Sequence, residues 1–358
     1  MSLVWIRSMA ATFITLLMLQ PIMASANGGP LVNAAGGYGL LQLDEQSAIS
    51  LVREKVIFDI GQRTNPYETE ANVSVAYELH NQDEVRTTVD IIFLTPAQGN
   101  LMVTEGSKRL PSAEAADPRL VNWAPGMKDN VIEPISGKQL PMRGSSYGQE
   151  AVGTQFSLTF EPNETKSIVI RYTDRGGMYD RGVINTIYSH LYYLSPAKFW
   201  EGKPFVELEI RLPDLGNTLH SNLPLVKVDS VTYKADFNDL PEGEWYFSYA
   251  ESSRILFPTN MEKDHNLLVL GTSAVGAILA AGAALLLRRN SIYLVSAAGI
   301  FIFIVYYITK MGGYPFNGIF VGITDVMAGA MLMFGYTRVR RRNRRSTEKS
   351  AEDRSQSQ

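Results

Sequence analysis

Residues 267–287 read LLVLGTSAVGAILAAGAALLL, a run without a charged side chain, and Arg288 and Arg289 follow at once. At about 1.5 Å of rise per residue, a helix of this length reaches roughly 31 Å and spans the hydrocarbon core of a bilayer. We therefore predict a first transmembrane helix at 266–288. This helix divides the chain into a long part before it and a short part after it.

The two parts carry opposite net charge. Residues 27–265 hold 21 basic and 32 acidic side chains, whereas residues 266–358 hold 11 basic and 4 acidic ones. An acidic folded part argues against nucleic acid as a partner, because phosphate binding needs positive charge on the folded surface. The chain has no cysteine, which excludes disulfides and thiolate chemistry.

Residues 1–26 have the pattern of a secretory signal peptide. Arg7 precedes an apolar run at 9–23, and Ala24-Ser25-Ala26 has the small residues of a cleavage site. A retained anchor helix is the alternative interpretation. Residues 27–44, rich in Gly and Asn, are then expected to be a flexible mature N-terminus.

Residues 45–262 contain several stretches in which apolar and polar side chains alternate, as they do in half-buried strands. The clearest stretches are 73–79, 205–212 and 225–233, and 88–94 is a fuller apolar run that ends at Pro96. No segment here has the 3.6-residue apolar stripe of a long helix. We predict a mainly β extracellular domain, an antiparallel sandwich of one or two subdomains. Residues 97–150 are expected to form a long irregular excursion from it.

Two further apolar runs of spanning length follow, which we predict as transmembrane helices at 291–309 and 316–336. The cytoplasmic segments that flank transmembrane helices carry an excess of Lys and Arg, so the arginines indicate which ends of the helices lie in the cytoplasm. Three crossings place eight arginines inside, whereas two crossings would leave the last six outside. These residues are Arg288, Arg289, Arg338, Arg340, Arg341, Arg342, Arg344 and Arg345.

The predicted fold is therefore a β ectodomain followed by an α-helical transmembrane bundle of three helices. Its predicted place is the bacterial plasma membrane, multi-pass, with the large domain outside the cytoplasm. Residues 337–358 form a basic cytoplasmic tail, and the part after Thr347 is polar enough to be disordered.

Two stretches of the β region carry a resemblance. The first alternates and then ends in an apolar run: Val73, Val75, Tyr77, Leu79, Asn81 and 91–96. The second reads YLSPAKFWEG at 193–202. Together they resemble uncharacterised bacterial exported β-sandwich proteins that are anchored in the membrane. That group tends to have Phe-Pro-Leu-Pro where this chain has FLTP at 93–96. The resemblance implies a β fold and no particular activity.

Catalytic and metal-binding motifs are missing from the sequence. The histidines at 80, 190, 220 and 265 form no pair such as H-E-x-x-H, and we expect isolated surface or interface residues. Gly-x-Ser-x-Gly is absent, and no Ser-x-x-Lys precedes a predicted helix. Two Asp-Arg-Gly triplets, at 174–176 and 180–182, lack calcium-loop spacing, so we expect solvated turns. We therefore predict no catalytic residue, no cofactor and no metal, and a protein that is not an enzyme.

Aromatic residues gather in the second half of the β region. They could line a glycan-binding face, but aromatic side chains in sandwiches more often fill the core, as we expect here. The residues are Trp123, Trp200, Trp245, Tyr188, Tyr192 and Tyr193.

Asp325 lies near the middle of the third apolar run. A carboxylate there costs roughly 2.5–3.5 kcal/mol on insertion scales, so it needs a partner. The other two runs contain no basic residue. We therefore expect Asp325 to face the bundle, where it is protonated or bonded to a hydroxyl such as that of Thr272, Ser273, Ser296 or Tyr306, or else to bond to a partner subunit. Two roles stay open: an assembly contact, in keeping with the spacing of Gly318 and Gly322, and a proton or cation relay.

These features predict a non-enzymatic, membrane-anchored envelope protein whose exported β-sandwich domain binds a protein or an envelope polymer. The expected partners are the lipid bilayer and a protein of the membrane or envelope. One alternative is a small membrane subunit of a transporter or channel that uses Asp325. Another is an envelope hydrolase, which requires two carboxylates about 5–10 Å apart in a groove.

Overall fold

The computed structural model describes residues 28–356 except 34–40, 63–64, 66–67, 97–100, 116–119, 125–129, 142–150, 214–215, 288 and 312–314. The predicted signal peptide, residues 1–26, lies outside the described residues. The chain divides into two compact units. The first is Met1–Ile132, Gln139–Met178 and Tyr188–Tyr249, and the second is Glu133–Lys138, Tyr179–Ile187 and Ala250–Gln358.

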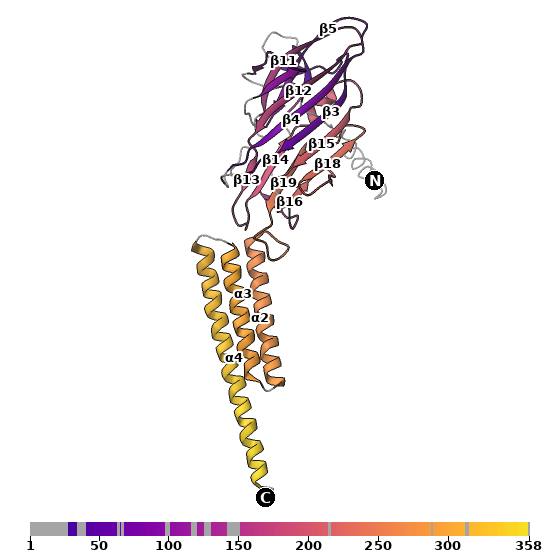
Figure 1. The fold of residues 1–358 in the computed structure, drawn as a ribbon. Coiled ribbons are helices and arrows are strands. Elements are labelled where there is room, and N and C mark those ends of the chain that lie inside the picture. Colours follow the sequence, from indigo (N-terminus) through magenta and orange to yellow (C-terminus); the bar gives the residue numbers. More distant parts are fainter. Residues whose placement is uncertain are drawn as a thin grey trace, which may run out of the picture. The chain divides into compact units, whose positions relative to one another are not determined.

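The largest sheet of the first unit has eight strands in the order β17-β18-β15-β3-β4-β12-β6-β7 (Figure 1). Four long strands form its centre: β15 (Phe205–Arg211), β3 (Ile49–Asp59), β4 (Ala71–Asn81) and β12 (Thr165–Asp174). The outer strands are β17 (Val226–Lys227), β18 (Thr232–Phe237), β6 (Met102–Glu105) and β7 (Lys108–Arg109). β15 pairs parallel with β3, whereas the other neighbouring strands of this sheet pair antiparallel.

Smaller sheets complete the described β structure. One has the order β2-β1-β5-β11-β8, another has β13-β14-β19-β16, and β9 pairs with β10. The first comprises β2 (Leu41–Leu43), β1 (Gly28–Asn33), β5 (Thr87–Thr95), β11 (Val152–Phe160) and β8 (Ala113–Glu114). The others are β13 (Gly177–Tyr179), β14 (Ile187–Tyr192), β19 (Trp245–Glu251), β16 (Asn217–Ser221), β9 (Asn130–Ile132) and β10 (Gln139–Pro141).

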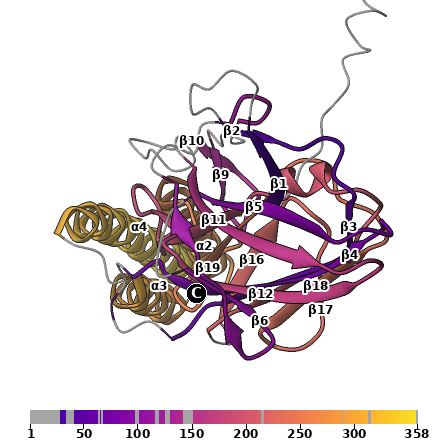
Figure 2. The ribbon, with the colours of Figure 1, turned by 90° about the horizontal axis from the view of Figure 1, so that it is seen from above.

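One hydrophobic core joins three of these sheets. The eight-stranded sheet contributes side chains such as Val75 and Leu208, the five-stranded sheet Phe93, and the four-stranded sheet Trp245 and Phe247. Figure 2 shows β1, β5 and β11 as one layer, with β3, β4 and β12 in the layer facing it. The aromatic residues that the sequence assigns to the core are all buried, which confirms that prediction: Trp123, Trp200, Trp245, Tyr188, Tyr192 and Tyr193.

Strand β3 contains an irregularity that changes which residues face the core. Its register with β4 shifts between Leu51 and Arg53, and Val52 between them is 43% exposed. An extra residue of this kind is a β-bulge, which re-aims the side chains that follow it. Leu51 is buried before the bulge, whereas Glu54 and Val56 are buried after it. The bulge thus places a carboxyl group in the apolar core.

The second unit contains three helices: α2 (Glu262–Leu286), α3 (Asn290–Met311) and α4 (Pro315–Gln356). Within the described residues, α2 is the helix long and apolar enough to cross a membrane, and 291–300 is a shorter apolar stretch. The chain is therefore mainly β with three C-terminal helices, as predicted. This finding does not support a multi-pass arrangement, and three crossings stay a prediction.

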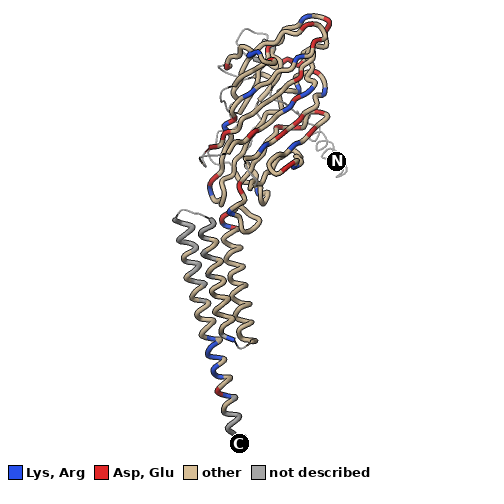
Figure 3. The backbone as a smooth tube through the Cα atoms, in the orientation of Figure 1, with Lys and Arg blue, Asp and Glu red and all other residues tan. Residues whose placement is uncertain are grey.

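Helix α4 continues through the tail that composition predicts to be disordered. Arg344 and Glu348, one turn apart, lie 3.3 Å apart from Nε to Oε1, a spacing that stabilises a helix. No Gly or Pro interrupts residues 336–356, and Arg, Glu and Lys are good helix formers. Figure 3 shows the basic cluster on this C-terminal part of α4.

Three regions differ from the sequence interpretation of the β domain. The stretch 97–150, expected to be irregular, contributes five short strands within its described residues, β6 to β10. The stretch 27–44, expected to be flexible, supplies β1 and β2 to a sheet. The expected antiparallel sheet contains one parallel pair, β3 with β15. β1, β6, β8 and β15 pair with segments distant in sequence, which local periodicity does not reveal, whereas β7, β9 and β10 are short strands that pair with a neighbouring segment.

Candidate functional site

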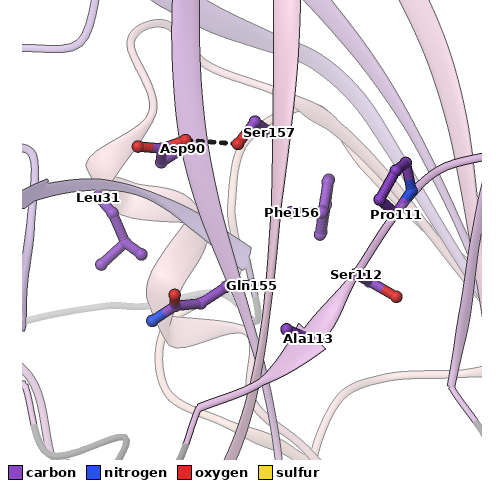
Figure 4. Close-up of a pocket in the computed structure, with 8 residues that line it drawn as sticks. All are labelled: Leu31, Asp90, Pro111, Ser112, Ala113, Gln155, Phe156 and Ser157. Carbon is purple, nitrogen blue, oxygen red and sulfur yellow. Dashed lines mark hydrogen bonds between the residues drawn. The ribbon is translucent and has the colours of Figure 1, made fainter.

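A groove of about 530 Å³ opens on the five-stranded sheet (Figure 4). Its lining comes from four strands and a short connection: Leu31 of β1, Asp90 of β5, 155–157 of β11 and 111–113 at β8. A volume of this size lies in the range of ligand-binding pockets. The groove is therefore the main candidate for a binding site in the first unit.

The pairing of β5 with β11 brings Asp90 and Ser157, two polar residues of this groove, next to each other. Asp90 lies opposite both Ser157 of β11 and Leu31 of β1. The Ser157 hydroxyl donates to Asp90 Oδ1 at 2.5 Å, as Figure 4 shows. Both side chains are exposed, because they alternate with the core-facing residues of their strands. Asp90 is the one carboxylate in the described lining of the groove.

The groove lies beside an open sheet edge. β8 pairs with β11 only at Thr154 and Gln155, and the Ala115 amide donates to the Gly153 carbonyl. Beyond Gln155, no strand of the described chain pairs with that side of β11, up to its end at Phe160. An open edge offers backbone donors and acceptors to an added strand, and the adjoining groove offers space for its side chains.

A second group of polar residues lies inside the core, around the carboxyl that the bulge places there. Tyr192 donates to Glu54 Oε1 at 2.7 Å, and the Tyr77 hydroxyl lies 3.4 Å from that of Tyr192. Burial raises the pKa of Glu54 to about 7, against the lowering effect of these hydroxyls. Glu54 Oε2 has no hydrogen-bond partner among the described residues.

Asp174 and His190 form a buried pair in the same unit. Asp174 Oδ2 lies 2.5 Å from His190 Nδ1, and neither side chain is exposed. Two sequence expectations are therefore wrong, because Asp174 is not in a solvated turn and His190 is not a surface histidine. Gly176 (φ +56°) is required here, since a Cβ at this position would lie 2.6 Å from His190 Cε1.

Glu244 is a half-buried carboxyl that contacts the short 3₁₀ helix η1 (Ser195–Phe199). Its Oε2 accepts from the Ser195 amide at 3.1 Å, and burial raises its pKa to about 7. Ser195 and Lys198 do form a Ser-x-x-Lys spacing on this helix. The Ser195 hydroxyl is buried and accepts from Trp123 Nε1 at 2.5 Å, so it is not presented to a substrate.

The residues that the sequence singles out lie in the second unit. The side chains of Asp325 and Gly318 lie outside the described residues, as does Arg288. A Cβ at Gly322 would meet no atom within 4 Å, so this glycine packs against nothing in the described part of its own chain. The glycine that packs tightly is Gly335, where a Cβ would lie 2.1 Å from the Tyr293 hydroxyl.

The arginines of α4 lie in its C-terminal half, and the described side chains there are mostly exposed. Arg338 stacks its guanidinium 5.2 Å from the centre of the Phe334 ring. In the described part of the chain, no three His, Asp or Glu side chains come together as a metal site requires. The arrangement offers binding surfaces and buried polar groups.

No protein-family model matches the sequence, and no curated protein matches it. Among solved structures, it is similar to a Legionella pneumophila protein provisionally described as nutrient binding. The identity is 13%, the match covers 63% of this chain and 72% of that one, and the TM-score is 0.42.

Two peptidase structures are also similar over part of the chain. An M1 zinc metallopeptidase from Deinococcus radiodurans is 9% identical, with 57% of this chain and 43% of that chain covered and a TM-score of 0.29. Yeast LTA4 hydrolase is 10% identical, with 60% and 31% covered and a TM-score of 0.29. The chain thus spans under half the length of both peptidases. Resemblances of this size carry no argument about function.

Proposed function

We propose that this chain is a membrane-anchored envelope protein whose exported β domain, a sandwich of its two layers of sheet, binds an extended segment of a partner protein. The observation behind this proposal is the groove at Asp90 and Ser157 beside the open edge of β11. The binding is non-enzymatic. An envelope polymer is the other partner that such a groove could hold.

The mode of binding follows from the strand geometry. A partner strand added at 156–160 of β11 would gain main-chain hydrogen bonds, which supply affinity without much sequence preference. Alternate side chains of that strand would enter the groove, because side chains alternate along a strand. Asp90 favours a basic or hydroxyl-bearing side chain there.

The proposed anchor is the group of three helices. Helix α2 has the length and composition of a membrane span, and the 22 residues of α3 reach roughly 33 Å as a helix. The arginines of α4 follow its apolar half, where the positive-inside rule places the cytoplasm. This supports three crossings, with the β domain outside and the C-terminus in the cytoplasm of a bacterial cell.

Photo-crosslinking in the native membrane tests the binding proposal. A photoreactive amino acid at the exposed groove residue Ser112 is expected to capture a partner protein, and the same probe at exposed Val85 serves as the matched control. Asp90→Asn and Gln155→Ala should lower the yield of the adduct. Equal yields of adduct from both positions, or no adduct from Ser112, would contradict the proposal. An adduct with an envelope polymer would show that the partner is the polymer and not a protein.

An alternative function makes the helices a subunit of a transporter or channel that uses Asp325. A hydroxyl-lined groove between α2 and α3 is the observation in its favour. Asp325→Asn separates the two functions: loss of ion flux with assembly intact favours transport, and loss of partner co-purification favours anchoring. The hydrolase hypothesis needs two facing carboxylates, and the described lining of the β-domain groove has only Asp90.

A further inference from the structure

Helices α2 and α3 enclose a groove of about 490 Å³ within the second unit. Small residues form much of its wall, including Gly276 of α2 and Gly299 of α3. A Cβ at Gly276 would lie 3.6 Å from Ile300 Cδ1, so the two helices close against each other there. A Cβ at Gly299 would meet nothing within 4 Å, so this wall is open to an incoming helix.

One polar side chain in this groove lacks a partner. Ser273 is 8% exposed, and its Oγ has no hydrogen-bond partner among the described residues. The neighbouring Thr272 differs, because its hydroxyl donates to the Leu268 carbonyl of its own helix at 2.8 Å. A buried hydroxyl without a partner is unfavourable, so the groove is suited to an occupant that carries a hydrogen-bonding group.

The depth of Ser273 limits what that occupant can be. Ser273 lies 11 residues after the start of α2 at Glu262, which is roughly 16 Å along the helix. Within the predicted span 266–288, Ser273 is seven residues from the start, so it lies roughly 10 Å inside a hydrocarbon core about 30 Å thick. Lipid headgroups lie outside that core, so the bonding group has to come from another membrane helix.

Helix α4 carries such a group at the same depth. α2 and α4 begin at the same end of the unit, because α3 runs back between them (Figure 1). Asp325 lies 10 residues after the start of α4 at Pro315, or roughly 15 Å along it. The register between helices supports this comparison, since Tyr307 of α3 donates to Asn266 of α2 at 2.6 Å, each four residues from its helix end.

Two described glycines flank Asp325 along α4 and have open space beside them. Gly322 and Gly329 lie three residues before and four residues after Asp325, which places all three on one stripe of the helix. A Cβ at either glycine would meet no atom within 4 Å. The helix positions on this stripe are therefore small residues on either side of Asp325, which suits the open wall of the groove.

We propose that α4 of a second copy of this chain docks in the α2–α3 groove, where the carboxyl of its Asp325 bonds to the Ser273 hydroxyl. The proposal rests on the membrane anchoring proposed above. Two copies related by a two-fold axis would make this contact twice, since each has both the groove and the stripe. Such pairing also gives the Asp325 carboxyl the partner that it needs inside a membrane.

Cysteine crosslinking of the full chain in native membrane vesicles tests this, because the chain has no cysteine of its own. One tagged copy carries Gly299→Cys and a differently tagged copy carries Gly329→Cys. These positions lie roughly 18 and 21 Å from the same end of the unit, and both have room for a side chain. We expect a disulfide between the two tags on mild oxidation.

Two further variants connect the crosslink to the proposed bond. Ser273→Ala or Asp325→Ala in both copies should lower the yield several-fold, the effect expected of losing an interhelical hydrogen bond. Ile278→Cys replaces Gly299→Cys as the matched control and should give no crosslink, because Ile278 is 70% exposed and lies on the side of α2 away from Ser273 and Gly276.

Several outcomes would overturn the proposal. One is the absence of a crosslink between the two tagged copies, including a crosslink that forms only when both cysteines are in one copy. Another is a crosslink yield that Ser273→Ala and Asp325→Ala leave unchanged. A disulfide from Gly299→Cys to an unrelated protein, in place of the Gly329→Cys copy, would also overturn it. Labelling of a cysteine at Ser346 from outside the cell would show instead that the anchoring has failed, which separates the two proposals.

Discussion

His190 Nδ1 and Asp174 Oδ2 lie 2.5 Å apart, in a place where neither side chain reaches solvent. Asp174 ends strand β12, and His190 lies within strand β14. Phe247 stacks on the His190 ring at 5.2 Å between centroids, and Phe58 lies 5.6 Å from it. The pair therefore connects two sheets through a polar contact inside an aromatic core.

Removing one member of this pair should destabilise the protein strongly. Asp174→Ala leaves His190 buried without its partner, and such losses cost about 3–5 kcal/mol. Urea unfolding of the full chain in detergent, followed by near-ultraviolet circular dichroism, measures the change. The control is Asp180→Ala, an exposed residue of the second Asp-Arg-Gly triplet, which should change little. Equal effects of the two substitutions would contradict the assigned role.

Glu54 should make stability fall as the pH rises. Its folded pKa of about 7 exceeds the ordinary value of 4.5, so the folded state holds the proton more tightly than the unfolded state. The contribution of Glu54 to the free energy of unfolding, roughly 3 kcal/mol, is present in full below about pH 4.5 and is lost as the pH rises through about 7.

Glu54→Gln should remove the share of this slope that belongs to Glu54, because an amide does not titrate. The free energy of unfolding, measured between pH 5 and pH 8, should become flatter in the variant, which should exceed the wild type at pH 8. Glu244, with a pKa also raised to about 7 by burial, contributes a second slope of the same sign. An unchanged slope in Glu54→Gln would show that Glu54 is not protonated near pH 6.

The two glycines of α4 should respond in opposite ways to a methyl group. Gly335→Ala forces the new Cβ against the Tyr293 hydroxyl and should cost about 1–3 kcal/mol. Gly322→Ala meets no neighbour within 4 Å in its own chain and should leave the Tm of the detergent-solubilised monomer unchanged or raised. The reverse order of Tm values would contradict the packing of α3 against α4.

Single-cysteine labelling should report the threading of the chain. Val85→Cys, at an exposed position of the β domain, should react with an impermeant maleimide in intact cells. Ser346→Cys, within the arginine-rich part of α4, should react only after the membrane is permeabilised. Labelling of Ser346→Cys alone in intact cells would reverse the proposed topology.

Several long strands could be predicted from local patterns. The alternation at 73–79 falls within β4, the apolar run at 88–94 within β5, and the alternation at 205–212 agrees with β15 to within one residue. β4 alternates because it buries one face, whereas residues 91–95 of β5 are all buried and give a continuous apolar run. β1 could not be predicted this way, because its Gly28 and Gly29 leave room for Tyr77 and Leu43, which are distant in sequence.

The buried carboxyls show where a local signal existed and was missed. Glu54 has the same parity as Val56 and Phe58, so the alternation already placed an acid on the apolar face of β3. Ile49 and Leu51 have the opposite parity, which required a bulge between 51 and 54. Asp174 offered no such signal, because its partner His190 comes from a separate sheet.

The parallel pairing of β3 with β15 has a consequence for synthesis of the chain. Phe205 pairs with Arg53, so one edge of β3 stays unpaired until the ribosome has made β15, about 150 residues further along the chain. Until then, that edge can pair with another nascent chain. The native pairing of β3 with β15 is itself slow, because the two strands are far apart in sequence. A holdase chaperone is therefore expected to bind nascent chains that end before residue 211 more strongly than longer ones.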